Sequence, residues 1–112
     1  MELRYYQASS GRRPFVEWLE ALQDRRARAR VQARLAVVAS GSLGDVKSVG
    51  DGVVELRLHY GPGYRIYFAL VSEVVILLLC GGDKRSQDDD IKQAKRYLED
   101  FKRRTARAQG RC

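Results

Sequence analysis

Cysteine, histidine and proline are scarce in this sequence of 112 residues, which has two cysteines, one histidine and two prolines. Cys80 lies inside an apolar run and Cys112 at the last position. This spacing fits neither a disulfide framework nor a zinc knuckle, and it favours a reducing cytoplasm. Cys80 is most simply a small buried hydrophobic residue. Because His59 is the single histidine, a metal site built from histidines is excluded, and we expect neither a metal nor a cofactor.

Long apolar runs are missing too. The longest, residues 74–80, is far shorter than the roughly 20 residues that a membrane helix needs. No charged segment followed by a long apolar stretch opens the sequence, so we expect no signal peptide and no membrane attachment. The G-x-S-x-G, H-E-x-x-H and phosphate-loop motifs of common enzyme classes are also absent.

The composition that is present predicts one basic globular domain. Hydrophobic residues make up 45% of the chain, which is enough for a core without a disulfide or a metal. At this length we expect one domain covering residues 1–112. The net charge of +7 favours a polyanionic partner, either a nucleic acid or an acidic protein. The alternative is a basic surface that binds no partner.

The N-terminal part predicts a strand and two helices. Residues 3–7 are typical of a short strand, and Pro14 suits the first position of a helix. Asp24 is a suitable cap for a second helix ending at about Ser40, so the two helices predict a helical hairpin. The first helix has an apolar face formed by Phe15, Trp18, Leu19 and Leu22, in which Trp18 is interpreted as a core residue rather than a base-stacking platform.

The second helix is rich in arginine. Its basic positions are Arg25, Arg26, Arg28, Arg30 and Arg34. Such a run is either a solvated face or a surface that contacts phosphates, and the sequence favours the two interpretations equally.

Two alternating segments, residues 53–59 and 64–70, predict a β-hairpin. Between them, Pro62-Gly63 has the chemistry of a type II turn. A three-residue loop would pair Tyr60 with Tyr64 and keep the apolar residues of both strands on one face.

This register decides which polar side chains meet. It places Arg57 opposite Tyr67, and His59 opposite Arg65. One face of the hairpin then carries Glu55, Arg57, His59, Arg65 and Tyr67, while the other face is apolar and must pack on the helices.

The C-terminal part predicts a central strand and a basic helix. Residues 74–80 are apolar on both faces, and Gly81-Gly82 is interpreted as a bend at the strand end. Ser86 with Asp89 predicts a capping box, and we expect the helix to fray after about Arg104. The fold class is therefore α+β, with an N-terminal strand and a helical hairpin packed on a twisted antiparallel sheet and a C-terminal helix.

The polar face of the hairpin is the best candidate site. Two guanidiniums on a sheet can bind a phosphate and stabilise the transition state of phosphodiester cleavage. If the substrate is RNA, its own 2′-OH can be the nucleophile. The possible proton carriers are His59, Tyr67, Lys84 and Glu55, of which His59 is the one obvious base at neutral pH. Alternatively, the charged residues form a cross-strand ion-pair ladder on a wet sheet face.

Two segments, ELRLHYGPGYRIYF and LLLCGGDKRSQDDDIKQA, resemble the RelE/ParE toxin superfamily and, within it, the HigB-like addiction module killer proteins. The resemblance spans nearly the whole chain, including the P-F-x-x-W-L helix and the G-D-V-K segment before the sheet. It implies a RelE-like fold and a toxin of a type II toxin–antitoxin system. It also implies cleavage of mRNA on the ribosome through the 2′-OH without a metal, and a helix-turn-helix antitoxin as partner.

By motif, the resemblance implies that Arg65 is the arginine of the transition state. Arg57 and Lys84 match basic residues of the preceding strand and of the segment after the last strand. RelE carries a tyrosine near its last segment, and Asp90 or Ile91 falls near that place here. The full set of catalytic candidates is Arg65, Lys84, Arg57, His59 and Tyr67, with Asp88 a weaker one. The residues expected to bind RNA are Lys47, Arg57, Arg85, Gln87 and Lys92.

Two other functions remain open at this point. ParE-like inhibition of DNA gyrase would need protein binding and no phosphodiester chemistry. A non-catalytic nucleic-acid-binding module would use the same basic surface without cleaving anything.

Overall fold

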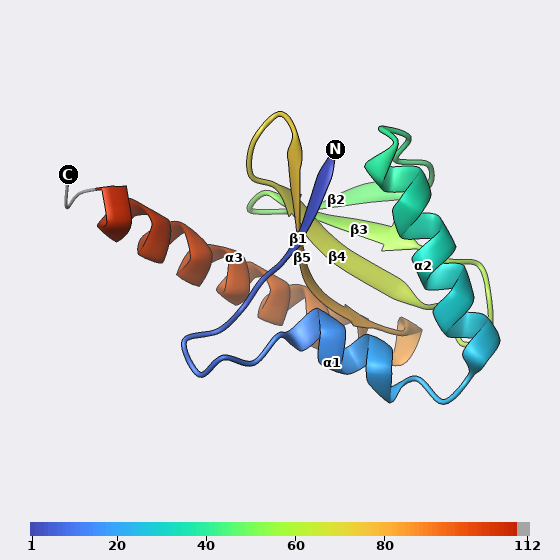
Figure 1. The fold of residues 1–112 in the computed structure, drawn as a ribbon. Coiled ribbons are helices and arrows are strands. Elements are labelled where there is room, and N and C mark those ends of the chain that lie inside the picture. Colours follow the sequence, from blue (N-terminus) through green and yellow to red (C-terminus); the bar gives the residue numbers. More distant parts are fainter. Residues whose placement is uncertain (110–112) are drawn as a thin grey trace.

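A computed structural model describes residues 1–109, which form one five-stranded sheet covered by helices on both faces (Figure 1). The strands are β1 (Glu2–Tyr5), β2 (Val46–Gly50), β3 (Val53–Arg57), β4 (Arg65–Leu70) and β5 (Val75–Gly82). The helices are α1 (Pro14–Ala21), α2 (Arg25–Ala39) and α3 (Gln87–Gln109), with a short 3₁₀ helix η1 (Lys84–Ser86) before α3. The predicted α+β class is confirmed.

The sheet is mixed rather than wholly antiparallel. Its strand order is β1-β5-β4-β3-β2, and every pair is antiparallel except β1 with β5. The parallel pairing is possible because the whole chain between Tyr5 and Val75 separates the two strands and gives a long crossover.

One face of the sheet packs on α1 and α2. Phe15 of α1 and Val31 of α2 are fully buried there against Leu56, Ile66 and other apolar residues of β3, β4 and β5. Trp18 packs against the same cluster, as the sequence predicts for a core residue. Asp24 caps α2 by accepting hydrogen bonds from the backbone of Arg26 and Ala27.

Helix α3 covers the opposite face and crosses β5, β4 and β3. Ala94 and Leu98 are buried in a second cluster with Tyr67 and Leu79. Cys80 is buried in this cluster, as the sequence predicts, and burial raises the pKa of its thiol to about 12. The polar face of the hairpin is therefore not a wet surface, because α3 lies over much of it. The C-terminal half of α3 extends beyond the sheet (Figure 1).

The predicted hairpin register is wrong by two residues. Arg57 pairs with Arg65, and Glu55 pairs with Tyr67. In keeping with this register, the backbone N–H of Leu58 donates a hydrogen bond to the carbonyl of Tyr64. A shift of two residues leaves every side chain on its predicted face, because side chains alternate with a period of two.

The cause of the shift is the turn. It closes one residue earlier than predicted, with Gly63 N–H donating to the carbonyl of Tyr60. Gly61 occupies the second turn position at φ +56°, a backbone conformation that favours glycine, and Pro62 follows it. Because Leu58 already bonds to Tyr64, the loop spans residues 59–63 and is longer than the predicted Gly61-Pro62-Gly63.

Gly81 and Gly82 continue strand β5 instead of bending it, since they pair with Ile66 and Arg65 of β4. Both positions exclude a side chain. A Cβ atom on Gly81 would overlap the Trp18 ring, and one on Gly82 would overlap the Asp90 carboxylate. These glycines allow α1 and the start of α3 to approach opposite faces of the strand.

The predicted capping box also differs. Asp83 accepts hydrogen bonds from the backbone of Arg85 and Ser86, and the Ser86 hydroxyl lies near the backbone N–H of Asp83. Asp89 takes no part in this box. Helix α3 continues past Arg104 to Gln109, and Cys112 lies outside the described residues. Among residues 1–109, no helix is both long and apolar enough to cross a membrane.

Candidate functional site

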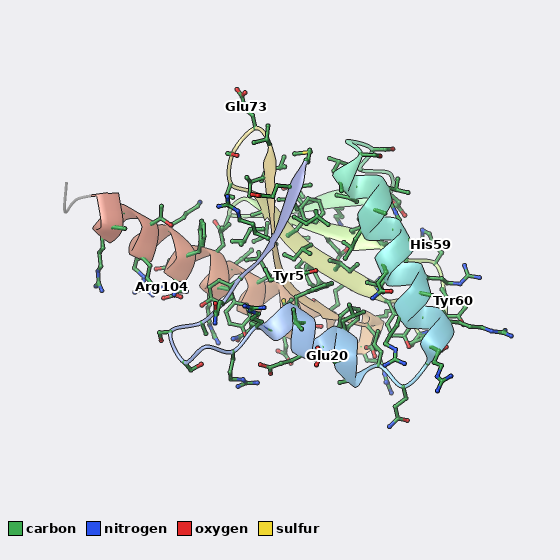
Figure 2. The ribbon with its side chains drawn as sticks, viewed as in Figure 1. Tyr5, Glu20, His59, Tyr60, Glu73 and Arg104 are labelled. Carbon is green, nitrogen blue, oxygen red and sulfur yellow. The ribbon has the colours of Figure 1, made fainter. Side chains whose placement is uncertain are left out.

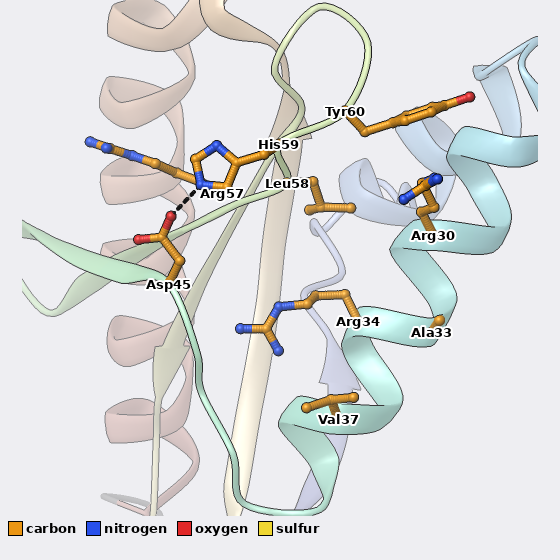
Figure 3. Close-up of a pocket in the computed structure, with 9 residues that line it drawn as sticks. All are labelled: Arg30, Ala33, Arg34, Val37, Asp45, Arg57, Leu58, His59 and Tyr60. Atoms are coloured by element: carbon orange, nitrogen blue, oxygen red, sulfur yellow. Dashed lines mark hydrogen bonds and ion pairs between the residues drawn. The ribbon is translucent and has the colours of Figure 1, made fainter.

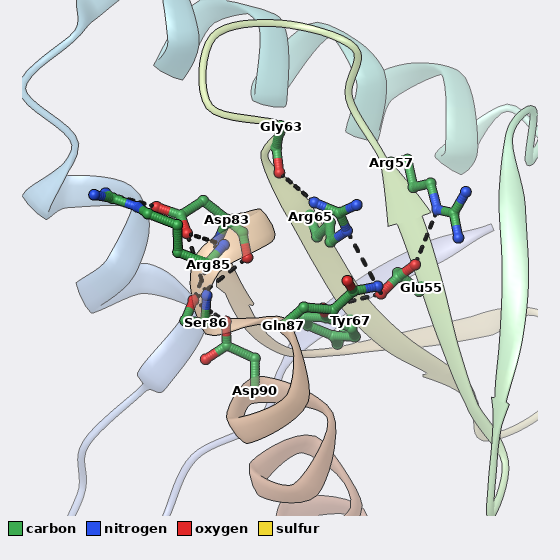
Figure 4. A network of polar contacts seen from close by, with 10 residues as sticks. All are labelled: Glu55, Arg57, Gly63, Arg65, Tyr67, Asp83, Arg85, Ser86, Gln87 and Asp90. Atoms are coloured by element: carbon green, nitrogen blue, oxygen red, sulfur yellow. Dashed lines mark hydrogen bonds and ion pairs between the residues drawn. The ribbon is translucent and has the colours of Figure 1, made fainter.

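Arg57 and Arg65 face the same side of the sheet as direct cross-strand partners, and this pair is called the arginine row below. On β5, Gly82 pairs with Arg65 in the same line across the sheet. Two like charges opposite each other repel unless a counter-charge lies between them. Glu55 supplies that charge. Its side chain is fully buried and contacts Arg57, Arg65, Tyr67 and Gln87 (Figure 4).

The Glu55 carboxylate is the centre of a five-residue network. Arg57 Nε donates to Oε1 at 3.0 Å, and Tyr67 OH and Gln87 Nε2 donate to Oε2 at 3.0 and 2.8 Å. Arg65 Nε lies 3.7 Å from Oε2 and completes an ion pair. The network therefore joins β3, β4 and the first turn of α3 around one negative charge.

Burial alone would raise the pKa of Glu55, because it disfavours the charged form. The hydrogen bonds from Gln87, Arg57 and Tyr67, together with the positive charge of Arg57, outweigh burial and hold this pKa below its ordinary value. Glu55 is thus a permanent anion at neutral pH, which makes it a counter-ion rather than a proton carrier.

Tyr67 is fully buried beneath α3. Burial, followed by the neighbouring charge of Glu55 and the hydrogen bond to it, raises the pKa of this phenol. The hydroxyl donates to Glu55 and has no exposed path to a substrate. Its place in the structure is that of a support for Glu55.

Arg65 is held from two sides. Its Nη1 donates to the Gly63 carbonyl at 2.7 Å, and its Nε is buried beside Glu55 without a hydrogen bond. The side chain is 12% exposed, compared with 34% for Arg57. Within residues 1–109 no hydrogen bond uses Arg65 Nη2. The guanidinium is consequently fixed in place while one terminal nitrogen keeps its donors for a ligand.

Lys84 and Arg85 follow Gly82 and are exposed at the start of η1. Arg85 forms an ion pair with Asp83 at 3.3 Å, whereas Lys84 forms no salt bridge with any described residue. The Lys84 Cβ lies near Gly63, beside the loop that holds Arg65. Of these two predicted basic residues, Lys84 is the one with an unneutralised charge next to the arginine row.

The other predicted RNA-binding residues lie at different depths. Lys47 is exposed on the edge strand β2 and pairs with Glu55, so it shares the face of the network. Gln87 is half-buried and is engaged with Glu55. Lys92 is exposed on α3, and no described contact joins it to the network. The structure therefore brings Lys47 and Gln87 to the arginine row and leaves Lys92 apart.

His59 does not lie opposite Arg65 as predicted. It follows the last paired residues of β3, is exposed, and its Nε2 lies 2.6 Å from Asp45 Oδ2 (Figures 2 and 3). Asp45 comes just before β2, and its backbone carbonyl accepts a hydrogen bond from Arg57. The imidazole is thus placed at the Arg57 end of the row by a carboxylate that the sequence analysis missed.

Asp90 is a second carboxylate whose surroundings were not predicted. It accepts a hydrogen bond from Ser86 Oγ at 2.5 Å, above Gly82. Burial raises its pKa, the charges of Asp83 and Asp89 raise it further, and the Ser86 hydrogen bond opposes them. The sequence signal for this arrangement is that residue 82 is a glycine. The structure explains it, because a Cβ atom there would overlap the Asp90 carboxylate. Among the described residues, no three His, Cys, Asp or Glu side chains are grouped as metal ligands.

Comparison with known proteins places the chain in a family. Residues 17–106 match the family model of phage-derived Gp49-like proteins, a family of addiction-module toxin-like proteins. An uncharacterized protein of Haemophilus influenzae is 51% identical over 87 residues, which are 78% of this chain and 88% of that protein.

Proposed function

The chain belongs to the phage-derived Gp49-like family, and from this premise we propose that it is the toxin of a toxin–antitoxin pair that cleaves mRNA on the ribosome. The observation that carries the proposal is the row of Arg57 and Arg65, fixed by buried Glu55 and flanked by exposed Lys84. Three neighbouring cations suit a phosphodiester whose negative charge increases during cleavage.

The reaction proposed is attack of a ribose 2′-OH on the adjacent phosphorus. The new bond joins the 2′-oxygen to phosphorus, and the bond from phosphorus to the 5′-oxygen breaks. The products are a 2′,3′-cyclic phosphate and a 5′-hydroxyl. Arg65 and Arg57 stabilise the extra negative charge on the phosphoryl oxygens, since their guanidiniums are already oriented before the substrate binds.

His59 is proposed as the base that takes the proton from the 2′-OH. Asp45 accepts the Nε2 proton, which leaves Nδ1 with a lone pair for the substrate. The departing 5′-oxygen takes a proton from the Lys84 ammonium. In this scheme Tyr67 and Gln87 are positioning residues, because both donate to Glu55 and neither needs to contact RNA.

Cleavage of a defined mRNA during translation in vitro, followed by primer extension, tests the proposal. We expect cuts that require the ribosome and that disappear when the mRNA carries a 2′-deoxynucleotide at the mapped position. Arg65→Ala should lower the cleavage rate by about 100- to 1,000-fold, the usual loss when one transition-state donor is removed. Lys84→Ala, at an exposed position, tests the same surface without disturbing the buried network.

Arg26→Ala is the matched control, because it removes the same charge from an exposed position on α2 and should cleave like the wild type. If Arg65→Ala and Lys84→Ala both cleave mRNA at the wild-type rate, the proposed location of the active site is wrong. Loss of DNA supercoiling by purified gyrase in the presence of the protein would instead favour inhibition of gyrase.

The partner proposed is a helix-turn-helix antitoxin, in keeping with a family of the toxin–antitoxin type. Co-expression of this chain with the protein encoded by the neighbouring gene should restore growth and give a stable complex on size-exclusion chromatography. Continued growth arrest with no complex would contradict that partner.

A further inference from the structure

A cleft of about 440 Å³ opens between α2 and the end of β3 (Figure 3). Arg57 lines this cleft and also donates to Glu55 in the candidate site. Asp45 and His59 also line the cleft, although the Arg57 side chain points away from α2 (Figure 3). The cleft therefore adjoins the end of β3, and an RNA strand that passes His59 there can extend into it. The catalytic scheme uses Asp45, Arg57 and His59 of its lining, but it does not use the wall that α2 and Tyr60 form.

An aromatic ring and a guanidinium form one wall. The guanidinium carbon of Arg30 lies 4.4 Å from the centre of the Tyr60 ring. The Tyr60 hydroxyl donates to Asp24 Oδ2 at 3.3 Å, which fixes the ring from its far end. Because both groups are planar and already ordered, they offer a stacking surface at low entropic cost. Figure 2 shows His59 and Tyr60 beside α2.

The floor of the cleft is apolar and its rim is charged. Leu58, Ala33 and Val37 form the apolar part, and Val37 is 45% exposed. Arg34 donates to the Leu43 carbonyl and so holds the segment that carries Asp45 at the rim. The rim carries Arg34 and Arg57 as well as Asp45, so its arginines outnumber its carboxylate. An apolar floor, a stacking wall and arginines at the rim suit a nucleotide, which has a planar base, a sugar and a phosphate.

We propose that this cleft binds the nucleotide next to the scissile phosphate in a single-stranded RNA. Its base stacks on the Tyr60–Arg30 pair, and its phosphate lies toward Arg57. This assignment rests on the proposed function for the position of the scissile bond. The binding of RNA in the cleft is measurable without cleavage.

Binding of a short fluorescein-labelled 2′-O-methyl oligoribonucleotide to the free protein tests the subsite, since the 2′-O-methyl groups block the reaction. We expect Tyr60→Ala to weaken binding by about 5- to 30-fold, the effect of losing one base stack. Tyr60→Phe keeps the ring and loses only the hydroxyl, so it should bind within about twofold of the wild type.

Arg30→Ala should weaken binding more than Arg26→Ala, although both remove one charge from α2. Arg26 is the matched control because it lies outside the cleft. In NMR spectra of the wild type, the methyl signals of Leu58 and Val37 should shift when the oligonucleotide is added. Unchanged affinity in Tyr60→Ala, equal losses for Arg30→Ala and Arg26→Ala, or no binding at all would overturn the subsite.

The two proposals fail in different ways. If the wild type cleaves no mRNA but Tyr60→Ala loses oligonucleotide binding, the proposed reaction is wrong and the subsite stands. If cleavage depends on Arg65 but Tyr60→Ala changes neither affinity nor the choice of cut sites, the subsite is wrong and the reaction stands.

Discussion

Glu55→Gln is the substitution that tests the central network most directly. It keeps the shape of the side chain and removes a fully buried negative charge that three donors and Arg65 share. Loss of one member of a buried ion pair costs about 3–5 kcal/mol. Because Arg57 is 34% exposed and glutamine still offers one acceptor, we expect the smaller loss of about 2–3 kcal/mol.

Thermal unfolding measures this loss. For a domain of this size about 1 kcal/mol corresponds to roughly 4 °C, so Tm should fall by about 8–12 °C. Glu17→Gln is the matched control, because Glu17 pairs with Arg12 on the exposed surface and its removal should leave Tm nearly unchanged. If Glu55→Gln unfolds at the wild-type temperature, the two arginines do not depend on Glu55 for their charge balance.

The pH dependence of stability gives a second readout of the same group. The pKa of Glu55 is lower in the folded protein than its ordinary value of about 4.3. Its contribution is therefore fully present above about pH 4.3 and is lost as the pH falls through the folded value. The difference in free energy of unfolding between wild type and Glu55→Gln should shrink in that acidic range. A difference that stays constant down to strongly acidic pH would refute the assignment of a lowered pKa.

Two further substitutions test other contacts. Gly82→Ala places a Cβ atom on the Asp90 carboxylate and near Ser86 Oγ, so it should lower the free energy of urea unfolding by about 1–3 kcal/mol; an unchanged midpoint would contradict the close approach. Tyr6→Phe removes a 2.6 Å hydrogen bond to Asp100 and should cost about 1 kcal/mol at neutral pH. Burial and this hydrogen bond raise the pKa of Tyr6 from about 10 to about 12. The cost of the substitution should therefore decrease as the pH rises through that range, and a cost independent of pH would refute the raised pKa.

The sequence predicts the elements better than the contacts between them. Asp24 as a cap, the apolar faces of the helices and the burial of Cys80 all follow from local patterns, and the structure confirms them. The hairpin faces were also correct, because alternation along a strand is a local property. The pairing of Arg57 with Arg65 was not predicted, since it depends on the conformation of Gly61.

The site shows a similar division. The arginines of the row were recognisable as candidates from the sequence, whereas the position of Asp45 beside His59 depends on how the segment before β2 approaches β3. The central role of Glu55 was missed because nothing local indicates that Gln87 of α3 reaches it. A glutamate between Val54 and Leu56 is the nearest sequence signal, and it fits an exposed strand position equally well.

The pairing of β1 with β5 has a consequence for the synthesis of the chain. The sheet cannot close until β5 has left the ribosome, and Tyr6 reaches its partner Asp100 only after 94 further residues have been made. Such distant contacts slow folding, because the intervening loop must be ordered first. Until β5 emerges, a nascent chain should therefore carry unpaired edges of β1 and β4, and its second core stays incomplete until α3 docks. The order of synthesis thus leaves the Glu55 network beside the arginine row incomplete until Gln87 has left the ribosome.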